Sequence, residues 1–359
     1  MEIRIAENIM KQYEIIEKVG EGANGIVWKV MHRQKLRLCA IKKCPDSFKN
    51  AAEAQRIFRE IEILSQLQGC ENIVSFRDLF LVESDVPNQI KDIYLVFEFL
   101  DADLDKIIRV GILEEVNKQY IIYQIIKAIW FMHSRGVIHR DLKPSNILSN
   151  KNCVIKIGDF GMARSYDHDP HDPLVNTNDN IMTDYVATRW YRAPEILLGS
   201  DNYGPKADVW AIGCILGEMI LGRVAFQGSS TLNQIEKIVE VLGKPTKEDL
   251  DDIGSPMGHT IMHSINHKRT LKLQNYFFGA NENSMDLLSK MLEFNPRKRI
   301  SAAEALDHKY LETCQDEEDL ARLREMAIDN RVIMGFDDNE LSHPEEYCQS
   351  LIEFIYYKD

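Results

Sequence analysis

The pattern of apolar and polar positions changes character about a hundred residues into the chain. Residues 13–30 place β-rich runs on both sides of a group of glycines, which predicts two strands joined by a turn. Short apolar runs at 38–42 and 93–97 predict two further strands, the second reached through a polar loop at 83–92. Strands should therefore dominate the N-terminal part.

Helical spacing of apolar residues first occurs at 53–67, and after about residue 103 the chain is mainly helical. Residues 116–132 and 208–221 are apolar on nearly all sides, which indicates buried helices. Strands followed by helices predict an α+β protein with two lobes: a small β-rich N-lobe and a larger, mainly helical C-lobe.

Composition places the 359-residue chain among ordinary soluble globular proteins, because 45% of its residues are hydrophobic and 28% are charged. The longest apolar helical run, 209–217, is too short to span a bilayer, and charged residues interrupt the first dozen positions, where a signal peptide would be apolar. The seven cysteines form no C-x-x-C pair, so we expect reduced thiols in the cytoplasm or nucleus.

The formal net charge of −13 argues against a nucleic-acid partner, which requires a basic face. Residues 311–359 hold 14 acidic and 4 basic side chains and so carry most of this charge. An acidic segment favours basic partners or serves only solvation, and the charge alone leaves both interpretations open.

The first candidate for chemistry is the run Gly20-x-Gly22-x-x-Gly25-x-Val27. Glycines let the backbone approach a phosphate closely, and successive N–H groups can bind an anion. A dinucleotide fingerprint would lead directly into a helix, whereas this run continues into a β-like segment at 26–30. An ordinary hairpin turn explains the glycines equally well.

A second candidate is a pair of opposite charges at apolar positions. Glu60 falls within the apolar arc of the helix predicted at 53–67, and burying a carboxylate there requires a cation. Lys42, on the strand predicted at 38–42, is the nearest one. Alternatively, Glu60 lies at the edge of the stripe and reaches solvent.

Three motifs in the C-terminal part are far more specific. The chain reads HRDLKPSN at 139–146, DFG at 159–161 and APE at 193–195. Together with the glycine run, Lys42 and Glu60, and in this order, they form the signature set of protein kinases. The chain thus resembles the eukaryotic Ser/Thr protein kinases, which implies their bilobal fold and transfer of the γ-phosphoryl group of ATP.

The resemblance also implies a role for each matching residue. Asp141 would orient the substrate hydroxyl and accept its proton, and Lys143 would contact the γ-phosphate. Lys42, positioned by Glu60, would hold the α- and β-phosphates. Oxygen atoms of Asn146 and Asp159 would bind Mg²⁺.

The adenine site follows in the same way. Phe97 would be the gatekeeper, the carbonyl of Glu98 and the amide of Leu100 would hold adenine, and Asp103 would lie near the ribose. The complete ATP-binding set implied is Val19, Gly20, Glu21, Gly22, Ala23, Asn24, Gly25, Ile26, Val27, Ala40, Lys42, Phe97, Glu98, Leu100, Asp103 and Leu148.

Two further acidic residues have implied structural roles. Asp208 would steady the backbone of the catalytic loop; it could equally cap the N-terminus of a helix, and both roles can hold together. Glu195 would pair with Arg299 to anchor the substrate platform. All catalytic positions are filled, and the two departures from the usual motifs, Cys39 and Met162, keep apolar character.

Within the kinases, the chain resembles the mitogen-activated protein kinases from about residue 13 to 320. The residues that carry this are a Thr-Asp-Tyr lip at 183–185, VATRWYRAPE after it, MLEFNPRKRISAAEALDHKYL at 291–311 and an insertion-like stretch near 243–280. DIYLVFEFLDADL and GCILGEM are most similar to the atypical branch called extracellular signal-regulated kinase 7/8. The 359 residues do not include the long C-terminal extension of that branch, so we expect either a part of a longer protein or a compact relative.

The lip implies activation by phosphorylation of Thr183 and Tyr185. By the same resemblance, phospho-Thr183 would be bound by Arg59, Arg140 and Arg164, and phospho-Tyr185 by Arg189 and Arg192. The alternative is that both hydroxyl residues are ordinary loop positions. Residues 186–192 resemble those that accept a Pro after the phosphorylated residue, which implies Ser/Thr-Pro substrates.

Two features outside the motifs allow a second interpretation. Asp316 and Asp319 match acids that form a docking patch for basic peptide motifs in the family, or they begin a solvated acidic helix. His259, His263 and His267 recur every four residues, but apolar residues lie opposite them and no Cys or carboxylate joins them. We expect a polar helix face there rather than a metal site.

The expected organisation is an N-terminal segment at 1–12, a kinase domain at 13–311 and an acidic extension at 312–359. Within the domain, the N-lobe covers 13–98, the hinge 98–103 and the C-lobe 104–311. Cofactors would be ATP and Mg²⁺. Partners would be protein substrates and regulators with basic docking motifs, and an upstream dual-specificity kinase unless the lip phosphorylates itself.

We expect a monomer in the cytoplasm or also in the nucleus, without nucleic-acid or membrane partners. Two alternatives to a mitogen-activated kinase remain at this stage. A cyclin-dependent relative would carry a PSTAIRE-like helix and no lip tyrosine, whereas this helix reads AEAQRIFREIEIL and Tyr185 is present. A docking scaffold with secondary catalysis is disfavoured by the intact Asp141, Asp159 and Lys42.

Overall fold

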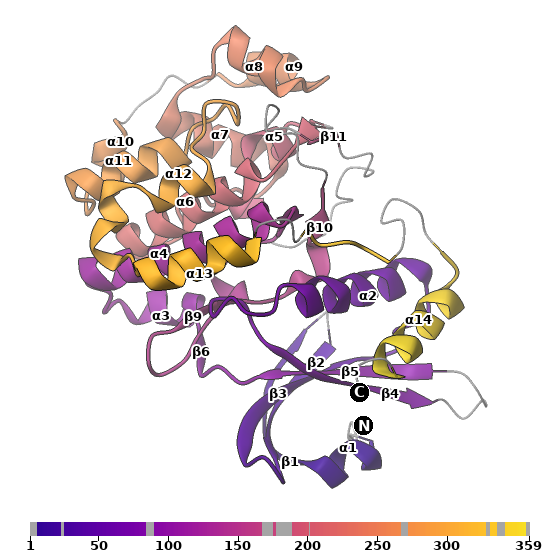
Figure 1. The fold of residues 1–359 in the computed structure, drawn as a ribbon. Helices are drawn as coiled ribbons and strands as arrows, with labels where there is room; N and C mark the ends of the chain where they lie inside the picture. The colour runs from indigo at the N-terminus through magenta and orange to yellow at the C-terminus, as the bar shows by residue number, and fades with distance from the viewer. Residues whose placement is uncertain are drawn as a thin grey trace. The chain divides into compact units, whose positions relative to one another are not determined.

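The structure, a computed structural model, describes residues 6–22, 25–83, 90–166, 175–176, 189–200, 202–266, 272–327, 331–335 and 342–356. The chain divides into two units (Figure 1). The first comprises Met1–Gln68, Ile73–Asp101 and Met334–Asp359, and the second comprises Gly69–Asn72 and Ala102–Ile333.

A five-stranded antiparallel sheet forms the centre of the first unit, with strand order β1-β2-β3-β5-β4. Its strands are β1 (Tyr13–Gly22), β2 (Gly25–His32), β3 (Arg37–Cys44), β4 (Phe76–Glu83) and β5 (Ile90–Glu98). The buried side chains of β2 alternate strictly along the strand, as expected for a sheet with one face on the core.

Three helices accompany this sheet: α1 (Glu7–Gln12), α2 (Ala51–Gln66) and α14 (Pro344–Tyr356). Ile9 of α1 packs with Tyr13, Trp28, Val30 and Ile41 in one buried cluster. The N-terminal segment therefore contributes to the core of the first unit. Asn50 caps α2 by accepting a hydrogen bond from the amide of Glu53 at 2.8 Å.

Helices dominate the second unit. They are α3 (Leu104–Val110), α4 (Glu115–Ser134), α5 (Pro194–Leu197), α6 (Lys206–Leu221), α7 (Thr231–Leu242), α8 (Lys247–Ile253), α9 (Gly258–Ser264), α10 (Leu273–Tyr276), α11 (Glu282–Met291), α12 (Ala302–Leu306) and α13 (Glu317–Ala327).

Short strands and single helical turns connect these helices. The strands are β6 (Ala102–Asp103), β7 (Val137–Ile138), β8 (Ile147–Ser149), β9 (Ile155–Ile157), β10 (Arg164–Ser165), β11 (Val175–Asn176) and β12 (Asn202–Tyr203). The turns are η1 (Pro144–Asn146), η2 (Phe160–Met162), η3 (Arg189–Tyr191) and η4 (Lys309–Cys314).

The core of the second unit is built on α4 and α6, which contact each other and are buried on almost all sides. Gly217 of α6 lets the Phe277 ring approach closely, since a Cβ there would stand 2.6 Å from it. No helix in the described part of the chain is long and apolar enough to cross a membrane.

The predicted α+β class with a β-rich and a helical part is confirmed. Strands and helices also occur where the apolar pattern predicted them at 13–30, 38–42, 53–67, 93–97, 116–132 and 208–221. The pattern missed β4 and α14, and α14 belongs to the first unit although it lies at the far end of the chain.

Candidate active site

The glycine run forms the β1–β2 hairpin, in which Gly22 pairs with Gly25. Gly25 has a φ of 115°, and a Cβ there would collide with the carbonyl oxygen of Lys43, so this position requires glycine. Gly20 and Gly22 have open space where a Cβ would be, which leaves their backbone accessible. Ala23 and Asn24 lie outside the described residues.

The predicted partner of Glu60 is present. Lys42 Nζ lies 3.0 Å from Glu60 Oε2 and 3.2 Å from Oε1, and the side chains are 15% and 5% exposed. A carboxylate on the buried side of α2 is thereby neutralised by a cation from β3. Of the two interpretations of Glu60, the structure has the ion pair.

Strand register gathers the other predicted ATP-binding residues of the first unit around Lys42. Val27 lies opposite Lys42, and Ala40 lies opposite Phe97. The Phe97 ring is buried and meets the Phe76 ring edge to face, with centroids 5.9 Å apart. Glu98 follows at the end of β5, and its carboxylate accepts a hydrogen bond from the Ser75 amide at 2.7 Å.

In the second unit, Asp103 and Leu148 are brought together by pairing of β6 with β8. Asp103 has a local role that the sequence did not reveal. Its carboxylate caps α3 by accepting a hydrogen bond from the Lys106 amide at 2.9 Å, and it pairs with Lys106 Nζ at 2.9 Å. Any contact with a ribose would share this carboxylate with the helix cap.

The catalytic segment brings three predicted residues within hydrogen-bonding distance. Lys143 Nζ lies 2.6 Å from Asp141 Oδ2, and the Asn146 side-chain amide donates to the Asp141 carbonyl at 2.9 Å and to its Oδ2 at 3.1 Å. Because the nitrogen of Asn146 is committed to Asp141, its amide oxygen is the atom left to coordinate a cation.

Asp208 fixes the backbone of this segment. Fully buried on α6, it accepts hydrogen bonds from the amides of His139 and Arg140, both at 2.9 Å, and its Oδ2 lies 2.9 Å from His133 Nε2. Burial alone would raise the pKa of Asp208, but the hydrogen bonds outweigh it and lower the pKa. The capping alternative is wrong, since the N-cap of α6 is Pro205 and has no side-chain hydrogen bond.

Asp159 has an unusual backbone, with φ 59° and ψ 74° in the left-handed region. Such a conformation is uncommon for a residue with a side chain and is typical of functional sites. The next residue, Phe160, is fully buried and packs against the His139 ring at 5.2 Å, and His139 Nε2 contacts the carbonyl of Gly158 at 3.0 Å. The DFG motif is thus held to the HRD motif.

A pocket opens beside Asp141 within the second unit. It is lined by Arg140, Asp141, Leu142, Tyr191, Arg192, Ala193, Ile196, Ala207, Asp208 and Ala211. A substrate side chain that enters it would lie next to the proposed base, and the pocket contains residues from the HRD motif and from the segment before APE.

Tyr191, one of the residues that line this pocket, belongs to a buried pair that the sequence did not reveal. Tyr191 donates a hydrogen bond to Glu218 Oε2 at 2.5 Å. Burial raises the pKa of Tyr191 far above its usual value and also raises the pKa of Glu218. The available signal was Glu218 itself, a carboxylate that interrupts the apolar helix at 208–221 and so requires a partner.

Glu195 and Arg299 form the expected ion pair, and it is bidentate. Arg299 Nη1 and Nη2 lie 2.8 and 2.9 Å from the two carboxylate oxygens, and neither side chain is exposed. Arg299 also donates to the carbonyls of Glu293 and Lys206. The APE segment is therefore tied to the end of α11 and to α6.

Thr183 and Tyr185 lie outside the described residues, as do 186–188, so the structure does not place the lip.

The five arginines assigned to the lip are described. Arg59, in the first unit, is buried and donates to Gln55 at 2.9 Å. Arg140, in the second, is buried with a left-handed backbone, while Arg164 donates to the Ala163 carbonyl and Arg189 to that of Ser229. Arg192 lines the pocket beside Asp141.

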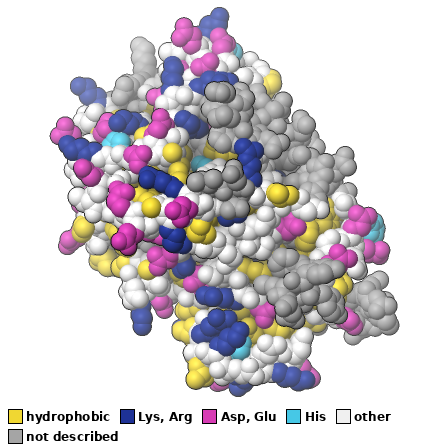
Figure 2. Space-filling view, viewed as in Figure 1, with side chains coloured by type: hydrophobic (Ala, Val, Ile, Leu, Met, Phe, Trp, Pro, Cys, Tyr) yellow, Lys and Arg dark blue, Asp and Glu magenta, His cyan; other side chains and the backbone are white. Residues whose placement is uncertain are grey.

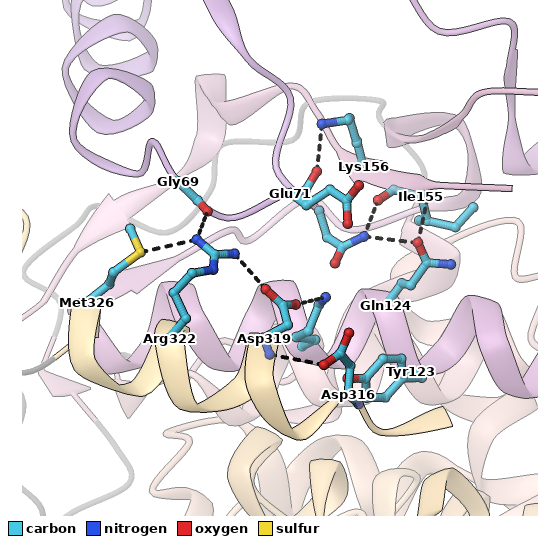
Figure 3. Close-up of polar contacts among 12 residues, drawn as sticks. Gly69, Glu71, Tyr123, Gln124, Ile155, Lys156, Asp316, Asp319, Arg322 and Met326 are labelled. Carbon is cyan, nitrogen blue, oxygen red and sulfur yellow. Dashed lines mark hydrogen bonds and ion pairs between the residues drawn. The ribbon is translucent and has the colours of Figure 1, made fainter. Parts of the chain in front are cut away.

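The two docking aspartates differ in their surroundings (Figure 3). Asp316 is exposed and accepts a hydrogen bond from the amide of Asp319 at 3.1 Å. Asp319 is only 18% exposed, because its carboxylate pairs with Lys127 Nζ at 2.5 Å and with Arg322 Nη2 at 2.6 Å. Both interpretations of this segment, a docking patch and a solvated acidic helix, require exposed carboxylates, and this is wrong for Asp319, whose charge is neutralised internally.

Arg322 extends this network to the turn after α2. Its Nη1 donates to the carbonyl of Gly69 at 2.9 Å, and Met326 packs over the same glycine (Figure 3). In the same turn, Lys156 donates to the carbonyl of Glu71 at 2.6 Å. Asp319 thus serves to anchor α13 and this turn within the second unit.

Of the three spaced histidines, two lie on α9 and His267 lies outside the described residues. A carboxylate does accompany His259, contrary to expectation: its Nε2 lies 2.8 Å from Asp251 Oδ1 at the surface. Met262, on the other side of the helix, is buried. No cluster of three or more His, Cys, Asp or Glu suited to a metal occurs in the described parts of the chain.

A β-rich unit with a Lys–Glu pair and a helical unit with ordered HRD, DFG and APE segments define a protein kinase. A family model described as protein kinase domain matches residues 13–311. The chain is 42% identical to extracellular signal-regulated kinase 2 of Dictyostelium discoideum, over 99% of this chain and 92% of that one. The chain belongs to the mitogen-activated protein kinase family of Ser/Thr protein kinases.

Other relatives agree with the predicted extracellular signal-regulated kinase 7/8 branch. The chain is 42% identical to mitogen-activated protein kinase 15 of Xenopus laevis and 40% identical to extracellular signal-regulated kinase 7 of Drosophila melanogaster, over 98% and 96% of its length. It spans only 58% and 36% of those two proteins.

Proposed function

We propose that this kinase phosphorylates Ser or Thr residues followed by Pro, and that phosphorylation of Thr183 and Tyr185 activates it. The ordered catalytic segment, in which Asp141, Lys143 and Asn146 form one hydrogen-bonded group, is the observation that carries the phosphoryl-transfer part of the proposal. Activity in signal transduction follows from the family; the substrate motif and the lip mechanism are inferred from residues 183–192.

The residues fit ATP and Mg²⁺. The open backbone at Gly20 and Gly22 suits phosphate oxygens, and the free amide oxygen of Asn146 with the Asp159 carboxylate offers the oxygen donors that Mg²⁺ prefers. When bound, Mg²⁺ and ATP supply the phosphoryl group and neutralise the charge that develops on it. Adenine would be held by the backbone of Glu98 and Leu100.

The chain's own residues then orient the reaction. Lys42, held by Glu60, binds the α- and β-phosphates, and Lys143 contacts the γ-phosphate. Asp141 receives the substrate hydroxyl in the pocket beside it and takes its proton. Since the transition state of phosphoryl transfer is loose, these residues act mainly through position and charge.

Lip phosphorylation would act through electrostatics. Each phosphate adds roughly −1.5 to −2 charges and three strong acceptors, which suit the guanidinium groups of Arg59, Arg140 and Arg164. Phospho-Tyr185 would be bound by Arg189 and Arg192. The intact catalytic set supports an active kinase over a scaffold, and the lip tyrosine with the mitogen-activated relatives supports this family over the cyclin-dependent one.

We also propose that regulators and substrates with a Lys/Arg cluster followed by aliphatic residues dock on the acidic start of α13. Asp316, Glu317 and Glu318 are exposed there. An aliphatic segment could continue over α4, where Val116 and Tyr120 are exposed one turn apart. A cytoplasmic and nuclear monomer, activated by an upstream dual-specificity kinase or by itself, completes the proposal.

A direct test is phosphorylation of a Ser-Pro peptide by the wild type, Lys42→Ala and Asp159→Asn. Each change removes charge stabilisation from the phosphates, so the rate should fall by about a hundred- to a thousandfold. Circular dichroism should show the fold retained. Near wild-type rates in either variant would contradict the assigned roles.

The same preparation tests the lip. Mass spectrometry of protein made in bacteria, with and without Asp141→Asn, shows whether the kinase phosphorylates its own Thr183 and Tyr185. Thr183→Ala should lower the activity of the phosphorylated enzyme more than substitution of neighbouring loop residues. Equal activity before and after complete phosphatase treatment would rule out activation through the lip.

A further inference from the structure

Three cationic side chains of the first unit lie near one another without an ion-pair partner among the described residues. They are Lys35 in the turn between β2 and β3, Arg37 at the start of β3 and Arg77 on β4. The chain as a whole carries a net charge of −13, so unpaired cations are unexpected in it. Lys and Arg side chains also gather at the lower end of the face in Figure 2, where the strands of the first unit lie in Figure 1.

The charges of these three side chains converge on the buried thiol of Cys39. Burial raises the pKa of Cys39, and the positive charges of Arg37, Arg77 and Lys35 act against that rise. Since charges act on one group in this way only when they are near it, the thiol marks the position around which they gather. Arg37 and Cys39 are two residues apart on β3, so their side chains lie on the same face of the sheet.

Arg37 gives the observation that points to an anion. Its Nε atom is buried and has no hydrogen-bond partner within the described part of the chain. A guanidinium group is always charged and presents five N–H donors in one plane. Because a buried donor without an acceptor is destabilising, this atom favours an anionic acceptor from outside the chain.

The acidic side chains nearby are engaged with backbone amides instead. Asp78, which faces the same side as Arg37, accepts a hydrogen bond from the Leu79 amide at 2.9 Å. Glu98, opposite Cys39 in the sheet, accepts one from the Ser75 amide at 2.7 Å. Neither acid forms an ion pair with the three cations in the described structure, so the cationic donors stay available.

The turn that carries two of the cations has a fixed shape. The amide of Leu36 donates to the His32 carbonyl at 2.9 Å, and the amide of Lys35 donates to His32 Nδ1 at 3.2 Å. Leu36 has a φ of 46°, an uncommon conformation for a residue with a side chain, and its side chain is 78% exposed. Lys35 and Arg37 therefore flank an exposed apolar side chain on an ordered backbone.

We propose that Lys35, Arg37 and Arg77 form an anion site that binds a phosphorylated Ser or Thr side chain of a protein partner. Leu36 would contact an apolar residue next to it. A phosphate carries roughly −1.5 to −2 charges and three strong acceptors, so it suits several cations and the planar donors of Arg37 better than a single carboxylate does.

An anionic membrane fits these observations less well. Basic clusters that bind lipid surfaces contain roughly four to eight cations, and the net charge of −13 repels such a surface. No residue of the proposed active site belongs to the anion site, so the inference stands apart from the proposed function.

The test is fluorescence polarisation of a labelled peptide mixed with the full chain at low salt and without ATP. The peptide contains one phosphoserine next to a leucine among neutral residues, and it should bind about tenfold or more tightly than its unphosphorylated form. Arg37→Gln should weaken binding about tenfold, and Arg77→Gln and Lys35→Gln about threefold each, as expected for lost charge-assisted hydrogen bonds. Lys91→Gln, which removes an exposed cation at the other end of the sheet, is the matched control and should not change binding.

A second variant separates a guanidinium site from general charge attraction. Arg37→Lys keeps the charge but loses the planar donors, so it should recover only part of the affinity. Full recovery would show that no specific site exists. If Arg37→Gln unfolds by circular dichroism, the exposed Arg77→Gln and Lys35→Gln decide the outcome.

Two further results would overturn the inference. Equal binding by the wild type and all the cation variants would mean that the phosphate binds elsewhere, for example at the arginines assigned to the lip. The second arm uses vesicles of phosphatidylcholine with phosphatidylserine. Sedimentation with these vesicles that depends on Arg37, without binding of the phosphorylated peptide, would assign the cations to a membrane surface instead.

Discussion

Charged residues at apolar positions carry most of the functional information in this chain. Glu60 pairs with Lys42, Glu218 accepts a hydrogen bond from Tyr191, and Asp208 holds two backbone amides of the catalytic segment. Each carboxylate interrupts a buried helix and would be strongly destabilising without its partner. A buried charge in a helical pattern therefore indicates a specific partner elsewhere in the chain.

Replacement of Phe97 should change both the stability of the protein and its affinity for inhibitors. Its ring is buried against Phe76 at the end of β5, so Phe97→Gly should open a cavity and cost about 3 kcal/mol or more of stability. Inhibitors with an aryl group that extends past the hinge should bind the glycine variant more tightly than the wild type. Inhibition constants and urea unfolding measure the two effects.

Phe97→Leu is the graded control, with a smaller gain in inhibitor affinity and a smaller loss of stability. If such inhibitors bind the wild type tightly, Phe97 does not act as a gatekeeper. Unchanged stability of Phe97→Gly would contradict the packing against Phe76.

At the scale of elements, α13 depends on a partly buried ion pair. Burial alone would raise the pKa of Asp319, but hydrogen bonds from Lys127 and Arg322 outweigh it and lower the pKa. Asp319 thus stabilises the fold while it is ionised, and Lys127 on α4 is 6% exposed. Loss of the carboxylate would leave that ammonium group buried without its partner.

Asp319→Asn should therefore lower the free energy of unfolding by about 2–3 kcal/mol near pH 7. The pKa of Asp319 is lower in the folded protein than in the unfolded chain, so its contribution is present above the unfolded value, about 3.9, and is lost as the pH falls through the folded value. The difference between wild type and variant should hence shrink below about pH 4. Urea unfolding across this pH range measures it.

Asp316→Asn is the matched control, because Asn caps a helix as well as Asp does and Asp316 is exposed. Its stability should stay near that of the wild type at every pH. A difference for Asp319→Asn that persists unchanged at low pH would show that the carboxylate contributes by packing rather than by charge.

At the scale of the whole molecule, the net charge is −13, but the acidic side chains do not form one continuous surface on the face drawn in Figure 2. Acidic side chains on the face in Figure 2 lie among Lys and Arg side chains. Asp319 illustrates the point, since two cations neutralise it internally. The proposed docking patch therefore consists of Asp316, Glu317 and Glu318 rather than of both aspartates equally.

Replacing these three with Asn, Gln and Gln should raise the KM for a substrate with a basic docking motif about three- to tenfold, since exposed ion pairs contribute about 0.2–1 kcal/mol each. The kcat should be retained, as expected for lost uniform binding. A short Ser-Pro peptide should be unaffected. High salt should remove the difference, because the Debye length falls from about 10 Å at 0.1 M to about 3 Å at 1 M.

Glu345→Gln with Glu346→Gln, two exposed acids of the first unit, is the control for net charge and should change neither KM. If the motif substrate and the short peptide suffer equally, these acids have a structural role and the docking proposal is wrong.

Much of the fold and of the active site could be predicted because the signals are local. Periodicity located the glycine hairpin, β3, α2, α4 and α6, and the motifs located Asp141, Asn146 and Asp159. Helix α14 was missed since its partner Phe58 is nearly three hundred residues away, and nothing in the segment itself names that partner. The cap at Asp103 was not predicted because Asp101, Asp103 and Asp105 all lie at the start of this helix, and residue type alone does not show which of them caps it.

The sequence by itself determined the α+β class, the kinase motifs and the family, because each depends on residue type and spacing along the chain. Only the tertiary structure decided how charges and helix faces are used. It placed Asp319 against Lys127, Tyr191 against Glu218 and Tyr347 against Phe58. A polar residue within an apolar pattern shows, from the local sequence, that a hydrogen-bond or charge partner is needed. Which distant side chain becomes that partner depends on how the helices pack.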